Sequence, residues 1–501
     1  MRDILISNPL RYIKILIVIG ILCLLFISLF SRTIADRDLW GYLSFGRIFW
    51  ESGYFPFQDI FSYTPTKPLW VYHEWLTGVI FYPILKYLGP AGLQLLRYIV
   101  IVLTIYLMYL TALKKGGNST SALIALIPAT VLISFGYGSV VRAQIFTYLF
   151  FILTIYIIEI ARKNQKWTVL LWILPIQVLW CNFHGGFVAG LGVICLYALG
   201  EGLSGRKFVP FIIILFPAIL VTLINPYGIE YWRYTIHAVT MPRPEINEWF
   251  SIFFALKINF FVNAIIIFIA LSIICLLFFI FQGRRYFTET LIITVTIYLG
   301  AKHIRHITFF AIVFGAFLPV IIFGLWETFF KKTAFFARLY WLSPIMLAIF
   351  FLSANLFMTK SFRVSNILLV PSFSIVVPEN LFPVGALKWM EENNFEGNIL
   401  PLYDWGEFLI WSCYPNCRVA MDGRYETVYS ENVYKEYFDF LMCREGWQIF
   451  LHKYPHDLIL MKPNAKIQLL MLKETQWKLA YSDPYSVLFI RKNYKSRGDS
   501  R

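Results

Sequence analysis

Apolar runs of about 20 residues recur from the N-terminus to Phe357, and each is long enough to cross a hydrocarbon core of about 30 Å. Only 15% of the residues are charged, against about 25% in soluble globular chains, so lipid must surround much of the surface. We expect spans near residues 12–32, 91–113, 119–138, 142–161, 167–182, 185–203, 208–225, 258–282, 287–302, 306–329 and 337–357. No small-residue cleavage site follows the first run, which indicates a retained helix rather than a signal peptide. The sequence therefore predicts a polytopic α-helical membrane protein with about eleven transmembrane helices.

The basic residues indicate how the chain is oriented. Every second loop carries a basic doublet, which is typical of cytoplasmic loops. The doublets are Lys114-Lys115, Arg162-Lys163, Arg206-Lys207, Arg284-Arg285 and Lys331-Lys332. This pattern explains most of the net charge of +15 without nucleic acid as a partner. It places the N-terminus in the cytoplasm and the C-terminus outside it.

Two segments on the predicted outer side are long, residues 33–89 and 226–257. The first interleaves aromatic residues with charges, and Leu39–Glu51 and Glu74–Lys86 have the pattern of amphipathic helices that lie along a membrane interface. Aromatic rings suit that depth because they are apolar in body and polar at one edge. We therefore expect a large first extracytoplasmic loop within a membrane domain of residues 1–357.

After Phe357 the pattern changes to short helices and strands. Helices are expected at Glu379–Asn393, Trp405–Trp411, Glu431–Leu441, Gly446–Tyr454 and Ala465–Glu474, and strands at Asn398–Tyr403, Arg418–Met421, Asp457–Met461, Lys478–Tyr481 and Val487–Arg491. This alternation predicts a small soluble α/β domain, residues 378–495, on the extracytoplasmic side. Its Cys413 and Cys417 either pair in an oxidising compartment or stay free. No second pair of ligands at zinc spacing accompanies them, so we predict no metal site.

Polar residues outside the basic doublets gather at the predicted outer ends of the helices. They are Asp36 and Asp38 after the first span, Arg142 and Gln144 at the start of the fourth, Asn182 and His184 between the fifth and sixth, Asn225 after the seventh, and Lys302, His303, Arg305 and His306 between the ninth and tenth. Singly, each has a structural explanation, such as a solvated cap, a snorkelling arginine or a tight turn. Their shared depth instead favours a site between helices, because ionisable groups near a bilayer are rare without a function.

The residue types suggest the chemistry of such a site. Asp36 or Asp38 can act as general base towards a hydroxyl. Arg142 and Arg305, with Lys302 and the histidines, can hold a phosphate. Gln144, Asn182 and His184 complete the candidate substrate contacts. Asp59 and Glu74 either join them or only fix the helices of the first loop.

The first loop resembles that of the GT-C class of membrane glycosyltransferases, with Asp36-Arg37-Asp38 after the first helix and the later stretches "PFQDIFSYT" and "WVYHEWL". It is most similar to the bacterial members grouped with the protein mannosyltransferases and the lipid A aminoarabinose transferases. The resemblance implies a polyprenyl-phosphate sugar as donor and an acidic residue of this loop as base. It puts Asp36 and Asp38 at the acidic motif, with Asp38 as base, and Arg142 and Arg305 at the lipid phosphate. The soluble α/β domain departs from the simplest protein mannosyltransferases, so the acceptor class stays open.

These observations favour glycosyl transfer at the outer face of a bacterial cytoplasmic membrane. The donor lipid and the membrane are the expected partners, and fixed cations make a metal or other cofactor unnecessary. One alternative is a transporter or flippase for a lipid-linked or anionic substrate, which predicts repeated halves and polar residues at the midplane. The other is a non-catalytic envelope assembly protein, in which the acidic pair would tolerate substitution.

Overall fold

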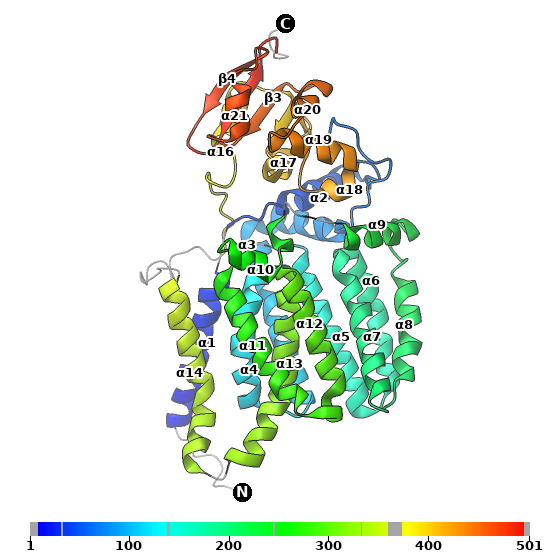
Figure 1. The fold of residues 1–501 in the computed structure, drawn as a ribbon, viewed down its shortest axis with the longest axis vertical. Helices are drawn as coiled ribbons and strands as arrows, with labels where there is room; N and C mark the ends of the chain where they lie inside the picture. Colours follow the sequence, from blue (N-terminus) through cyan, green and yellow to red (C-terminus); the bar gives the residue numbers. More distant parts are fainter. Residues whose placement is uncertain are drawn as a thin grey trace.

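The computed structural model describes residues 9–31, 34–137, 141–241, 243, 246–331, 333–358 and 373–494 of the chain. It forms a bundle of upright helices with a smaller domain at one end (Figure 1). The helices of the bundle are α1 (Pro9–Phe30), α3 (Trp75–Lys114), α4 (Ser119–Gly136), α5 (Gln144–Asn164), α6 (Ile173–Phe183), α7 (Val188–Leu203), α8 (Val209–Val221), α11 (Val262–Ile280), α12 (Phe287–Lys302), α13 (Ile307–Leu325) and α14 (Ala334–Met358).

Each predicted span coincides with one of these helices. Among the described residues, 7 helices are long and apolar enough to cross a membrane. Shorter apolar helices lie at Leu16–Phe30, Trp167–Phe183 and Val209–Val221, and α12 carries Glu289 in its first turn. The protein is a multi-pass helical membrane protein, and the number of eleven crossings stays a prediction.

The basic doublets meet acidic residues at the end of the bundle away from the smaller domain. Lys115 Nζ lies 3.1 Å from Glu159 Oε1 and 2.6 Å from Glu289 Oε1, and Arg162 Nη2 lies 2.7 Å from Glu201 Oε1. These buried pairs join the ends of α3, α5, α7 and α12. Breaking one of them would be strongly destabilising, because it would leave an uncompensated buried charge. Buried carboxylates therefore also lie at the end of the bundle that the sequence predicts to be cytoplasmic.

The first outer segment folds into α2 (Leu39–Ser52) and the first turns of α3. α3 changes direction at Gly89, whose φ of 64° falls in the left-handed region that glycine tolerates, just before Pro90. Both helices predicted in this loop are thus present. α2 does not lie freely on an interface, however, because Leu39–Gly46 are buried and α2 packs against α17 (Gly406–Cys413) of the smaller domain.

The second outer segment also folds, into α9 (Ile229–Thr240), the 3₁₀ turn η3 (Asn247–Trp249) and α10 (Ile252–Lys257). The chain passes through a further short turn, η5 (Ile304–His306), between α12 and α13. η3 and η5 lie side by side. Residues predicted at the outer ends of distant helices are therefore brought together by short turns at one end of the bundle.

The C-terminal domain contains a five-stranded mixed sheet with the order β2-β1-β3-β5-β4. β1 pairs in parallel with β2 and β3, and β5 pairs antiparallel with β3 and β4. The strands are β1 (Gly397–Pro401), β2 (Cys417–Val419), β3 (Leu458–Met461), β4 (Trp477–Ser482) and β5 (Val487–Arg491). The remaining elements, besides α17, are α16 (Val384–Glu392), η7 (Tyr403–Trp405), α18 (Tyr425–Val428), α19 (Glu431–Leu441), α20 (Gln448–Lys453) and α21 (Lys466–Met471). The predicted α/β domain is confirmed, whereas the boundaries 1–357 and 378–495 stay predictions.

This domain sits on the first outer segment (Figure 1). The backbone N–H of Val419 donates to Phe61 O at 3.0 Å, and that of Tyr63 donates to Val419 O at 3.3 Å, so the loop pairs with the edge strand β2. Cys413 and Cys417 are free thiols here. The domain is therefore attached to the bundle through the loop that carries the candidate acidic residues.

Candidate active site

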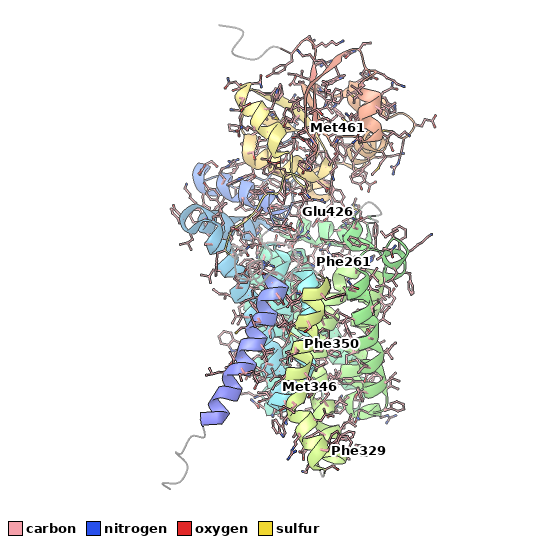
Figure 2. All side chains as sticks on the ribbon, turned by 90° about the vertical axis from the view of Figure 1, so that its left-hand side faces the viewer. Phe261, Phe329, Met346, Phe350, Glu426 and Met461 are labelled. Atoms are coloured by element: carbon pink, nitrogen blue, oxygen red, sulfur yellow. The ribbon has the colours of Figure 1, made fainter. Side chains whose placement is uncertain are left out.

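A cavity of about 580 Å³ lies between the C-terminal domain and the end of the bundle on which it sits. Glu426 of the domain and Phe261 at the start of α11 both line this cavity. Figure 2 labels both residues near the junction between the domain and the bundle. The predicted site residues that line it are Asp36, Asp38, Glu74, Arg142, Gln144, His184 and Arg305. Most of the candidates predicted from distant helix ends thus share one space.

Asp36 and Asp38 both face Arg142. Asp36 is buried; it accepts a hydrogen bond from the Asp38 backbone N–H at 3.0 Å, and its Oδ1 lies 3.4 Å from Arg142 Nε. Asp38 directly precedes α2 and makes an ion pair with Arg142 through its side chain, which stays 34% exposed. A third carboxylate, Glu248, pairs with the same guanidinium. Arg142 therefore joins the first loop to the second outer segment.

A second cation stands beside this group. Arg305 Nη1 lies 4.0 Å from Glu248 Oε2, and the Arg305 guanidinium lies 4.9 Å from the centre of the Trp249 ring. Arg243 contacts the same ring at 4.3 Å. Burial raises the pKa of Glu248, but Arg142 and Arg305 outweigh burial and leave it below its ordinary value. The cavity floor thus holds ionised Glu248 between two arginines.

A smaller cavity of about 240 Å³ adjoins the first and shares Arg142, Gln144, Glu248, Phe261 and Arg305 with it. The rest of its lining is mainly apolar and comes from α4, α11, η5 and α13: Phe135, Gly136, Ala264, Ile304, Ile307 and Thr308, with Tyr148 of α5. The Gln144 side-chain amide donates to the Tyr148 hydroxyl at 2.6 Å. An apolar space between membrane helices therefore ends at the two arginines.

The Glu74 carboxyl, on the membrane side of the cavity, has a strongly raised pKa. Burial and the nearby Asp38 charge raise its pKa to about 8, so it is mainly protonated at neutral pH. Its Oε1 lies 3.4 Å from His184 Nε2. His184 Nδ1 accepts from the Gly186 N–H at 2.8 Å, which leaves the ring proton on the nitrogen that faces Glu74. Burial lowers the pKa of His184 and that of its neighbour His73, the latter to about 4, so both rings are neutral.

The C-terminal domain supplies the opposite wall. Asp404 Oδ2 lies 2.7 Å from Arg37 Nη1, and Arg243 Nε donates to Glu426 Oε2 at 2.8 Å. Glu407 accepts the Gly41 backbone N–H of α2 at 3.0 Å. Burial, with the Asp38 charge next in effect, raises the pKa of Glu407 above its ordinary value. The domain therefore closes the cavity with ionisable groups that also hold it to the loop.

Other predicted residues lie outside the cavity. Asn182 accepts from Trp75 Nε1 at 2.9 Å and donates to Ile224 O at 2.8 Å, which ties three helix ends together on the side of the C-terminal domain. The side chain of Asp59 is fully buried, and its Oδ1 lies 2.7 Å from Arg424 Nη1. His303 Nδ1 lies 2.7 Å from Trp249 O, and Lys302 is exposed. These four belong to the scaffold around the cavity or to its surface and do not line it.

Sequence reasoning missed several lining residues: Arg37, His73, Arg243, Glu248, Asp404, Glu407 and Glu426. Arg243 and Glu248 lie in the second outer segment, where charges in "MPRPEINEW" share the predicted depth of the other candidates. That shared depth was a usable signal. No signal in the sequence pointed to Asp404, Glu407 and Glu426, because only the docking of the domain brings them to the site.

The described residues contain no group of three or more His, Cys, Asp and Glu side chains arranged to hold a metal ion. Asp36 and Asp38 are the carboxylates that a divalent cation would bridge. Both contact Arg142, whose guanidinium takes the place of that cation. The arrangement fits an anion held by arginines better than a metal held by carboxylates.

No protein-family model matches the sequence, and no curated protein matches it. Solved structures are similar to it in fold. The oligosaccharyltransferase of Archaeoglobus fulgidus in complex with Zn and sulfate gives a TM-score of 0.55 at 13% identity, covering 88% of this chain and 67% of that one. AglB from the same organism, in complex with an inhibitory peptide and a dolichol-phosphate, gives a TM-score of 0.57 at 11% identity, covering 94% of this chain and 74% of that one. ArnT from Cupriavidus metallidurans in the apo state gives a TM-score of 0.53 at 12% identity, covering 96% of this chain and 98% of that one. The chain therefore has the fold of the GT-C membrane glycosyltransferases.

Proposed function

We propose that this protein transfers a sugar from a polyprenyl-phosphate donor to an acceptor hydroxyl at the outer face of a bacterial cytoplasmic membrane. The observation that carries this proposal is the pair Asp36 and Asp38 opposite Arg142 and Arg305, where an apolar cavity between membrane helices meets a polar one. Such a junction suits a donor with a lipid tail and a phosphorylated sugar head. The fold, similar to that of an oligosaccharyltransferase in complex with a dolichol-phosphate, supports the same conclusion.

The two cavities suggest how the donor lies. Its first isoprene units occupy the smaller cavity between α4, α11 and α13, and its phosphate reaches Arg305 and Arg142. The Arg305 guanidinium can hold phosphate oxygens by two parallel hydrogen bonds, and the charge of Arg142 lies beside them. Gln144 and the His184–Glu74 pair then face the sugar. Arg305 is the main anchor, because Arg142 is already shared by three carboxylates.

Asp38 is the better candidate for the base. The Asp36 carboxylate is held by the Asp38 N–H and by Arg142, and its side chain is only 9% exposed, against 34% for Asp38. Asp36 therefore positions Arg142 and the start of α2. Asp38 keeps an oxygen within reach of a substrate in the cavity.

The reaction follows from these positions. The Asp38 carboxylate takes the proton of the acceptor hydroxyl, and the hydroxyl oxygen forms a bond to the anomeric carbon. The bond between that carbon and the phosphate oxygen breaks on the opposite face, which inverts the configuration. Arg305 and Arg142 stabilise the charge that develops on the leaving lipid phosphate. Fixed cations aimed at this charge lower the barrier because they need no reorganisation during the reaction.

A transfer assay tests this proposal. Purified protein in nanodiscs is incubated with a panel of radiolabelled undecaprenyl-phosphate sugars and extracted acceptor membranes. We expect Asp38→Asn to lower transfer by ~10²–10⁴-fold and Asp36→Asn to lower it less. Asp439→Asn, which changes a carboxylate on α19 that does not line the cavity, is the matched control. Unchanged transfer by the Asp36→Asn, Asp38→Asn double variant would refute the proposed base.

A further inference from the structure

The wall that the C-terminal domain adds to the cavity is aromatic as well as charged. Tyr403, Tyr425, Tyr434 and Phe438 line it, from η7, α18 and α19. Tyr425 and Tyr434 are stacked with ring centres 5.0 Å apart, and Phe438 lies 5.5 Å from Tyr403 and 4.6 Å from Tyr434. Tyr425 and Phe438 are buried, whereas Tyr403 and Tyr434 are half-buried. The outer two rings thus offer surface to the cavity, and the inner two support them.

Polar groups frame these rings. The Arg243–Glu426 and Arg37–Asp404 pairs lie around the same wall. The Tyr425 hydroxyl is buried and makes no hydrogen bond of good geometry within the described part of the chain. A sugar ring matches this combination. Its C–H groups pack on the faces of aromatic rings, which are electron-rich, and its hydroxyls bind planar charged groups at the edge.

The aromatic wall is next to the proposed base. A Cβ atom placed on Gly423, in the turn before α18, would lie 3.8 Å from Asp38 Oδ1. Tyr403 Oη lies 3.5 Å from the carbonyl oxygen of that glycine. A molecule resting on Tyr403 and Tyr434 can therefore present a hydroxyl to Asp38.

Other acceptor classes fit this wall less well. A peptide commonly binds by adding a strand to an open sheet edge, but the β2 edge, which is the edge at the first loop, is already paired with Phe61 and Tyr63. The chain of a lipid acceptor needs a continuous apolar surface. Here Arg243, Glu426 and Asp404 line the cavity together with the rings.

We infer that the C-terminal domain forms the acceptor subsite and that the acceptor is a saccharide, held on the ring faces of Tyr403 and Tyr434. The inference rests on the proposed function, since it assigns the second substrate of the same reaction. It also gives the domain a role: the membrane part binds the donor, and the domain selects the acceptor.

Binding to the full-length protein in nanodiscs tests this inference without turnover. Saturation-transfer NMR compares a panel of hexose and pentose oligosaccharides with a panel of peptides that contain Ser, Thr and Asn. We expect oligosaccharides to bind the wild type, and Tyr403→Ala and Tyr434→Ala each to weaken binding by ~10-fold. Tyr403→Phe and Tyr434→Phe keep the ring and should bind as the wild type does. Tyr485→Ala, which removes an exposed tyrosine outside the cavity, is the matched control.

Binding of undecaprenyl phosphate, followed by native mass spectrometry, separates this inference from the proposed function. It should be the same in all the tyrosine variants, which also shows that they are folded. Peptides that bind where no oligosaccharide does, or Ala variants that bind oligosaccharides as the wild type does, would overturn the acceptor assignment. Failure of undecaprenyl phosphate to bind, with the expected loss of oligosaccharide binding in the Ala variants, would refute the donor and leave the acceptor subsite supported.

Discussion

At the residue scale, two carboxyl groups near one another are kept in different states. Asp38 is ion-paired with Arg142, whereas Glu74 is buried beside His184 and near the Asp38 charge. The pKa of Glu74, raised to about 8, means that it can donate a hydrogen bond at neutral pH. We interpret the pair as a base and a neutral donor that face one substrate. Local environments that give two neighbouring carboxyl groups different protonation states are typical of acid–base sites.

This perturbation predicts a pH dependence of stability. Between the ordinary pKa of 4.5 and about 8, the folded protein keeps a proton on Glu74 that the unfolded chain has lost. The contribution of this proton to the stability of the folded protein is complete below that window and is lost as the pH rises through it. Glu74→Gln, which is neutral at every pH, should therefore gain thermal stability relative to the wild type as the pH rises from about 4.5 to about 8.

The unfolding midpoint of the purified protein at each pH is the measurement. Glu445→Gln changes an exposed carboxylate and should follow the wild type at every pH. A difference between Glu74→Gln and the wild type that does not vary with pH would contradict the raised pKa.

At the scale of elements, α2 is held close to α3 by glycines. A Cβ atom on Gly78 of α3 would collide with the carbonyl oxygen of Tyr42, and one on Gly46 of α2 would collide with that of Gly78. Neither backbone can give way cheaply in a close-packed interior. Because Asp38 directly precedes α2, this contact also fixes where the proposed base lies.

Gly78→Ala should therefore force the two helices apart. We expect it to lower the free energy of unfolding by about 1–3 kcal/mol and to reduce transfer through displacement of Asp38. Gly192→Ala is the matched control, because a Cβ atom on Gly192 of α7 meets nothing within 4 Å. Chemical denaturation and the transfer assay are the measurements. Equal behaviour of the two variants would mean that the α2–α3 contact is not tight.

Much at this scale could be predicted from the sequence. Each expected span is a helix, and each expected strand of the C-terminal domain is present, because hydrophobic periodicity is a local property of the chain. The depth of the polar residues was predictable for the same reason. The direction in which each side chain points could not be predicted. Asn182 and His184 are two residues apart, yet only His184 lines the cavity. Rotation about a helix axis and docking against neighbours decide that, and both are tertiary.

At the scale of the whole molecule, a buried charge network holds the C-terminal domain to the bundle. Arg424 Nη1 lies 2.7 Å from Asp59 of the first loop, and its Nη2 lies 2.7 Å from Asp422. Tyr429 Oη donates to Asp422 at 2.8 Å and lies 2.6 Å from Ser62 Oγ. The sequence left two roles open for Asp59, and its burial supports fixing of the loop rather than substrate contact.

Arg424→Met should release two buried carboxylates from their only shared cation among the described residues. We expect the free energy of unfolding to fall by about 3–5 kcal/mol, because unpaired buried charges are strongly destabilising. Arg444→Met removes an exposed pair with Asp439 and should change it by about 1 kcal/mol at most. Denaturation curves followed by tryptophan fluorescence compare the two. Similar small losses would mean that the network does not hold the domain in place.

The wall of the cavity that this domain supplies was beyond sequence reasoning for a physical reason. Glu407 and Glu426 lie more than 350 positions from Asp38 along the chain, and no local pattern reports a contact at that separation. Docking of the domain brings them together, through the pairing of β2 with the first loop and the packing of α17 against α2. The membrane half of the site was therefore predictable in outline, and the domain half was not.

We propose that the sugar of a polyprenyl-phosphate donor lies between Asp38 and Arg305. Native mass spectrometry of the protein, purified from its membrane in three forms, tests it most directly. We predict that the wild type carries a polyprenyl phosphate, that Asp38→Asn carries the same lipid with its sugar still attached, and that Arg305→Gln carries neither. Wild-type protein without such a lipid, or the same lipid content in all three forms, would contradict the claim.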